Sequence, residues 1–158
     1  MPGAAPDDCE LTERDLEKIR NLAFKFNKDD ANFYLVLLGR TLLPILESKF
    51  GGDNDQVLAI SQYVAGAEST EIEHAAEALE KIERVISLGR FPFSTEGFAV
   101  YVKCRALDAL GRHAEALPLR KLSYSTKNPN TDQVTKRLFC RADYGLRCYK
   151  TLAVMGRP

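Results

Sequence analysis

Apolar residues recur along this chain at the spacing of amphipathic helices, and this pattern constrains the fold more than any other feature. The clearest stripe holds Ile72, Ala76, Leu79, Ile82 and Ile86, three or four positions apart. Residues at this spacing share one face of an α-helix. With 158 residues, 45% of them hydrophobic, the chain is long enough and apolar enough to bury a core. We therefore predict an all-α fold.

Capping residues divide the chain into about seven predicted helices that pack as antiparallel neighbours. Thr12 with Asp15 resembles a capping box. Gly89 and Gly111 follow the ends of apolar stripes, where glycine closes a helix in the left-handed conformation. The predicted helices cover approximately residues 12–26, 31–50, 53–65, 70–89, 95–110, 113–124 and 131–155.

The second predicted helix is apolar on most sides. Residues 31–50 are therefore expected to form the central, most buried helix. Pro44 lacks an amide donor and is expected to kink it. Tyr34 and Tyr63 lie on apolar stretches and are expected in the core. Thr70, with Glu73 three positions later, is expected to cap the fourth helix.

The two ends of the chain differ in character from the middle. Residues 1–10 are rich in Pro, Gly and Asp and are expected to form a disordered tail, followed by a single helical domain over residues 11–156. No cationic segment followed by an apolar one opens the chain, as a signal peptide would need. The densest apolar stretch, residues 33–46, is shorter than the roughly 20 residues of a membrane span. We expect a cytoplasmic protein without a membrane span.

Residue types that carry catalysis or bind metals show no convergent pattern. The cysteines lack the short spacing of zinc ligands and are expected to be small buried hydrophobes: Cys9, Cys104, Cys140 and Cys148. His74 lies beside Glu73 and Glu77 on an expected exposed helix face, and His113 is expected to be structural. No nucleophile, phosphate-binding or dinucleotide motif is present. We expect a protein that is not an enzyme, with no cofactor, metal or catalytic residue.

One segment resembles a known helical repeat. Residues 106–122 read ALDALGRHAEALPLRKL, with a Leu110-Gly111 turn, the aromatic-type His113 and Glu115-Ala116-Leu117 opening a second helix. This is similar to the middle of a tetratricopeptide repeat, and the resemblance covers mainly residues 95–130. It implies stacked helical hairpins with Arg120 at a position usually filled by a large residue. An orthogonal helical bundle is the alternative.

Charge is segregated along a chain whose net charge is zero. Residues 1–89 carry 9 basic and 17 acidic side chains, whereas residues 112–158 carry 10 basic and 3 acidic ones. Separated charge of this kind creates a field that can steer a charged partner. The last predicted helix concentrates the basic groups on one side, at Lys136, Arg137, Arg141, Arg147 and Lys150. We expect this face to bind an acidic partner; the alternative is that it is only solvated or pairs internally with the acidic fourth predicted helix.

These features favour a non-catalytic protein–protein interaction module, an adaptor or scaffold that binds a partner peptide or helix. By the resemblance, the first helix of each hairpin lines the binding groove, which here implicates Tyr101, Lys103 and Arg105 together with the basic last helix. One alternative is an assembly or secretion chaperone with an exposed apolar groove, dimeric through its N-terminal helices. Another is binding of nucleic acid or an anionic surface by the basic helix, although no nucleic-acid-binding motif is present.

Overall fold

The computed structural model describes residues 10–125, and regular structure in this part of the chain is entirely helical. This confirms the predicted all-α fold. The elements are α1 (Glu13–Lys28), α2 (Asn32–Thr41), α3 (Leu43–Phe50), α4 (Asp55–Glu68), the 3-10 helix η1 (Ile72–His74), α5 (Ala75–Leu88), α6 (Glu96–Ala109) and α7 (His113–Ser125).

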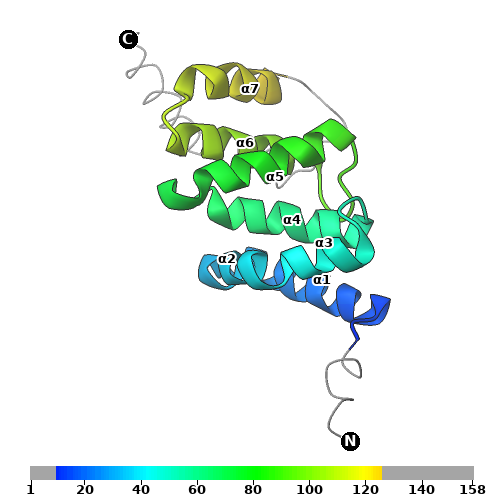
Figure 1. Ribbon diagram of the computed structural model, residues 1–158. Coiled ribbons are helices and arrows are strands. Elements are labelled where there is room, and N and C mark those ends of the chain that lie inside the picture. Colours follow the sequence, from blue (N-terminus) through cyan, green and yellow to red (C-terminus); the bar gives the residue numbers. More distant parts are fainter. Residues whose placement is uncertain (1–9, 126–158) are drawn as a thin grey trace, which may run out of the picture.

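The helices form a stack of layers (Figure 1). Helices α1, α2 and α3 make up one end layer, and α4, α5, α6 and α7 follow in sequence order, each packed against the next. Short connections join α4 to α5 and α6 to α7, so each of these pairs is an antiparallel hairpin. Helix α4 also contacts α1, α2, α3 and α6.

The central helix of the stack is α4. Every residue from 57 to 68 is buried, including Tyr63, which is only 3% exposed as expected for the core. The prediction that residues 31–50 are the most buried helix is therefore wrong. Helix α4 fits the centre because its small residues, such as Ala59, Ala65 and Ala67, let neighbouring helices approach closely on several sides.

Residues 31–50 form two short helices rather than one kinked helix. Helix α2 ends at Thr41, and α3 begins at Leu43 with Pro44 in its first turn. A proline is tolerated there because the first amides of a helix have no partner within the helix. Gly39 brings α2 close to α4, since a Cβ atom at this position would lie 2.4 Å from Val64 Cγ1.

Most helix ends follow the capping pattern of the sequence. Thr12 and Asp15 form a reciprocal capping box at the start of α1. Gly89 closes α5 in the left-handed conformation with a φ of 66°, and Gly111 follows α6 with a φ of 76°. Both ends are thus as predicted, because each cap depends on residues close together in sequence.

The start of the fourth predicted helix differs from the prediction. Thr70 caps nothing: its hydroxyl donates to the carbonyl of Ala67, at the end of α4. The chain then makes the single 3-10 turn η1 before α5 begins at Ala75. This turn brings His74 within hydrogen-bond distance of Arg40 on α2, which places it in the site described next.

Candidate protein-docking surface

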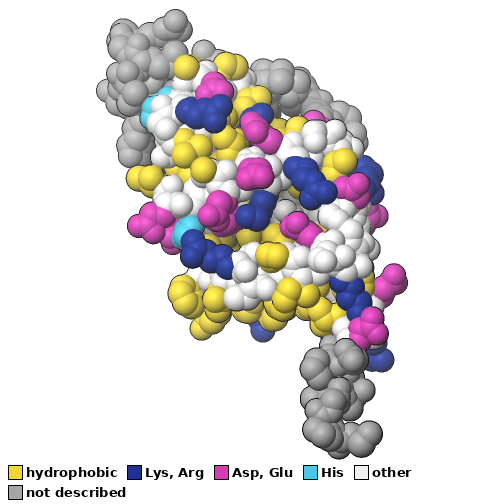
Figure 2. Space-filling model, in the orientation of Figure 1, with side chains coloured by type: hydrophobic (Ala, Val, Ile, Leu, Met, Phe, Trp, Pro, Cys, Tyr) yellow, Lys and Arg dark blue, Asp and Glu magenta, His cyan; other side chains and the backbone are white. Residues whose placement is uncertain are grey.

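Helix α2 exposes large apolar side chains instead of burying them. Phe33 is 74% exposed, Tyr34 55% and Leu37 47%, and Ile72 of η1 is 75% exposed. We call these four residues the α2 surface. Hydrophobic side chains form a band along the lower edge of the molecule, over the layer of α1, α2 and α3 (Figure 2). The prediction of Tyr34 as a core residue is wrong, because α2 buries only the side that faces α4.

Aromatic contacts hold two of these side chains in place. The rings of Phe33 and Tyr34 meet edge to face with their centroids 5.7 Å apart. The Tyr34 ring in turn stacks on Phe26 of α1 at 5.3 Å. Ring pairs of this geometry are favourable beyond the area they bury. These contacts favour one orientation of each ring, which reduces the conformational entropy lost when a partner covers them.

A hollow of about 290 Å³ opens beside the exposed rings, between α2 and the turn that leads into η1. Helix α2 lines it with Phe33, Val36, Leu37 and Arg40, and the facing turn lines it with Glu71 and His74. An apolar cavity of about 150 Å³ is enough to hold a benzene ring. The hollow can therefore receive one aromatic or branched side chain of a partner.

His74 forms the polar floor of this hollow and is only 9% exposed. The Nη2 atom of Arg40 lies 2.9 Å from His74 Nδ1. An arginine can only donate, so Nδ1 accepts and the ring proton is on Nε2, 3.5 Å from a carboxylate oxygen of Glu71. The expectation of an exposed helix face for His74 is therefore wrong, and His74 instead connects η1 to α2.

A second polar cluster lies next to this one, between α4 and α5. Glu68 is 2% exposed, and its burial raises the pKa of the carboxyl to about 7. Lys81 Nζ lies 2.9 Å from the buried carboxylate and opposes the shift. The hydrogen bond that Glu68 shares with Glu77 lowers the pKa of Glu77, as do the nearby charges of Lys81 and Arg40. Charge is thus coupled from the hollow to the α4–α5 hairpin.

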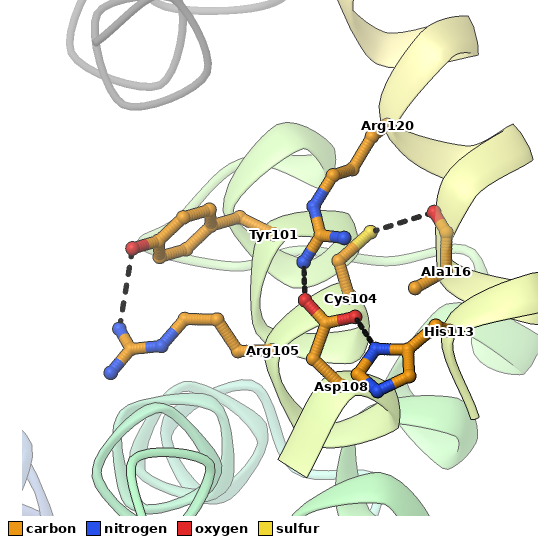
Figure 3. Close-up of polar contacts among 7 residues, drawn as sticks. All are labelled: Tyr101, Cys104, Arg105, Asp108, His113, Ala116 and Arg120. Atoms are coloured by element: carbon orange, nitrogen blue, oxygen red, sulfur yellow. Dashed lines mark hydrogen bonds and ion pairs between the residues drawn. The ribbon is translucent and has the colours of Figure 1, made fainter. Parts of the chain in front are cut away.

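The predicted site residues of α6 do not share one face. Tyr101 and Arg105 lie one turn apart, with the guanidinium 5.3 Å from the ring centroid and an Nη1 contact of 3.4 Å to the tyrosine oxygen (Figure 3). Lys103 instead faces α5, where its Nζ lies 3.5 Å from Glu83. The structure therefore brings two of the three together and separates the third.

The neighbouring polar contacts of α6 join it to α7. Asp108 accepts from Nδ1 of His113 at 3.0 Å and pairs with Arg120 (Figure 3). Arg120 is 2% exposed, and the buried Cys104 lies with its Sγ 3.8 Å from the carbonyl oxygen of Ala116. His113 thus has the structural position expected of it, at the turn of the hairpin. These residues stabilise the hairpin rather than present a surface.

Several predicted residues lie outside the described residues: Lys136, Arg137, Arg141, Arg147 and Lys150 of the basic face, and Cys9, Cys140 and Cys148. Within residues 10–125, no three His, Cys, Asp or Glu side chains gather as metal ligands would. None of the helices in this range has the length and apolarity needed to cross a bilayer.

The comparisons with known proteins supply no relative. No protein-family model, no curated protein and no solved structure matches this chain significantly.

The sequence reasoning missed the residues around the hollow, above all Phe33, Leu37, Arg40 and His74. The sequence held only part of the signal for them, and the structure supplies the rest. Helix α2 has apolar residues on every side, yet it is only ten residues long, and a short helix at the end of a stack cannot bury all its sides. When a short helix at the end of a stack has apolar residues on every side, this pattern is as consistent with an exposed contact surface as with a buried core helix.

Proposed function

We propose that this chain is a non-catalytic protein-interaction module built from tetratricopeptide-repeat-like hairpins, and that a partner protein binds at the α2 surface. The observation that carries the proposal is the set of exposed side chains Phe33, Tyr34, Leu37 and Ile72, of which Phe33 and Leu37 line the hollow. Monomers rarely expose contiguous apolar patches without a binding role.

The composition of this surface supports the proposal. Aromatic residues and arginine are the types most enriched where binding energy concentrates, and Phe33, Tyr34 and Arg40 lie together here. The partner segment that fits is apolar, with one bulky side chain for the hollow and a polar group beside Arg40 and Glu71. An amphipathic helix meets this description.

The Tyr101–Arg105 pair offers a second contact point, suited to an acidic partner. Within residues 10–125, no carboxylate lies at ion-pair distance from Arg105, whereas Lys103 is already 3.5 Å from Glu83. A guanidinium held against a tyrosine ring is partly positioned before a partner arrives. We assign Lys103 to the α5–α6 contact and keep Tyr101 and Arg105 as binding residues.

The chaperone alternative uses the same apolar surface for a different client. A chaperone of this kind holds an unassembled partner and suppresses its aggregation, whereas an adaptor binds a folded partner. The exposed apolar hollow favours both, and they differ in whether the bound protein is folded when it is captured.

Affinity purification from a native lysate with three forms of the full chain tests the proposal. Leu37→Glu places a charge at the hollow, and Ala114→Glu adds the same charge at an exposed position of α7, at the other end of the stack. We expect co-purifying proteins to be retained by the unmodified chain and by A114E and lost by L37E. Equal retention by all three forms, with unchanged thermal unfolding, would contradict binding at the α2 surface.

A further inference from the structure

We infer that the occupant of the α2 surface is a second copy of this chain, docked through a two-fold symmetric contact. This inference rests on the proposed function, because it uses the same surface, and it names the partner. A two-fold interface requires one patch to be complementary to itself. If one residue of the first copy contacts a second residue of the other copy, the same contact recurs with the two copies exchanged. Shape, charge and area of the α2 surface each meet this requirement.

The shape of the surface provides both a projection and a recess. Phe33 projects at the rim of the hollow, 74% exposed, and its ring is held against Tyr34. The hollow beside it has a volume of about 290 Å³, and a cavity of about half that size holds a benzene ring. In a two-fold dimer the Phe33 ring of each copy can enter the hollow of the other.

The charges at the surface are balanced within the patch. Helix α2 carries a single charged residue, Arg40, and the facing turn contributes Glu71 to the same hollow. Two copies related by a two-fold axis can therefore place Arg40 of each opposite Glu71 of the other. Residues 1–89 carry 17 acidic and 9 basic side chains, so this part of the chain repels its own copy. The sparsely charged patch is therefore the place where two copies meet at the least electrostatic cost.

The area of the patch suits a dimer. At roughly 180 Å² for each large side chain when fully exposed, the exposed fractions of Phe33, Tyr34, Leu37 and Ile72 amount to about 450 Å². A homodimer interface of standard size buries about 800 Å² per copy, of which about two thirds is apolar. The α2 surface thus supplies most of the apolar area such a dimer needs. The α2 surface also lies in the end layer of the stack. The end layer of a monomeric stack needs a polar outer face to stay soluble, so an apolar end layer favours contact with another molecule.

Sedimentation equilibrium of the full chain tests the inference. We expect the unmodified chain and Ala114→Glu to form dimers in the micromolar range, and Phe33→Glu and Leu37→Glu to be monomers with unchanged thermal unfolding. A natural chain that stays monomeric throughout this range overturns the inference, and so does a dimer that tolerates both α2 substitutions.

Charge exchange adds a test that only a two-fold contact passes. Arg40→Glu and Glu71→Arg should each weaken the dimer by at least about tenfold, because each places like charges opposite one another. An equimolar mixture of the two variants should form a heterodimer with affinity near that of the natural dimer, since both contacts are then between opposite charges. If mixing restores nothing although each variant alone is weakened, the two-fold pairing of Arg40 with Glu71 is refuted.

The failure of this inference is distinguishable from failure of the proposed function. A monomeric chain whose co-purifying protein is lost by L37E leaves the docking surface in place with a different partner. If the chain is monomeric and the L37E variant still co-purifies with every partner, both the dimer and the docking role of the α2 surface are refuted.

Discussion

The close approach of α2 to α4 gives a prediction whose magnitude follows from the structure. A Cβ atom at Gly39 would lie 2.4 Å from Cγ1 of Val64, and 3.5 Å from its Cβ and Cγ2. Carbon atoms in favourable contact are about 3.5–4.0 Å apart, so Gly39→Ala overlaps Val64 by more than about 1 Å. Val64 is 0% exposed and cannot turn into solvent.

The expected cost of Gly39→Ala is the difference between two effects. Overpacking a core costs about 1–3 kcal/mol, and replacing glycine by alanine inside a helix returns up to about 1 kcal/mol. We therefore expect the free energy of unfolding to fall by about 1–2 kcal/mol. Val64→Ala leaves a cavity and should itself cost roughly 1–3 kcal/mol.

The double variant Gly39→Ala/Val64→Ala separates this account from a general intolerance of α2 to substitution. The new methyl group then enters the space that Val64 vacates, so we expect Gly39→Ala to be neutral or stabilising in the Val64→Ala background. Urea unfolding followed by circular dichroism gives all four free energies of the cycle. Gly66→Ala is the comparison, because its added Cβ atom would lie 3.3 Å from Phe98 Cζ, a milder overlap for which we expect a smaller loss. Additive losses in the double variant would refute the steric reasoning.

Three further predictions concern titration, a buried ion pair and a helix cap. The pKa of Glu68 rises from 4.5 to about 7 on folding, so the folded state holds this proton more tightly than the unfolded state. The free energy of unfolding is therefore highest below pH 4.5 and falls as the pH rises to 7. This difference in the free energy of unfolding between pH 4.5 and pH 7 is about 3 kcal/mol, and Glu68→Gln should abolish it when unfolding is measured at both pH values. Asp108→Asn removes the charge that faces Arg120, only 2% exposed, from α6 and should cost about 1–3 kcal/mol in urea unfolding; a loss below the error of the measurement would count against the pair. Thr95→Ala removes the acceptor for the amide of Phe98 and should cost about 1 kcal/mol, whereas Thr95→Ser should cost little.

Local sequence signals predicted the helix ends well. The capping box of Thr12 and Asp15 and the left-handed Gly89 were predictable because each depends on residues within one turn of each other. The Tyr101–Arg105 contact was not among the predictions, although residues four apart lie on one helix face. Lys103, two positions from each, necessarily points elsewhere, and its spacing already implied this.

The tertiary environment was not predictable from local pattern. Helix α2 and helix α4 are both apolar on most sides, and only their positions in the stack decide that α4 is central while Phe33 and Leu37 are exposed. His74 lies in a polar sequence, yet Arg40, 34 positions earlier, holds it in a buried position. Contacts between residues so distant in sequence leave no periodic signal in either segment.

The central claim is that the chain acts through the α2 surface, and site-specific photo-crosslinking tests it most directly. A photoreactive amino acid replaces Leu37 in one sample and Ala114 of α7 in a matched sample, and both are irradiated in native lysate. The account predicts discrete protein adducts from position 37, either with a second copy of the chain or with another protein, and only weak, diffuse adducts from position 114. Equal and diffuse labelling from both positions would contradict it.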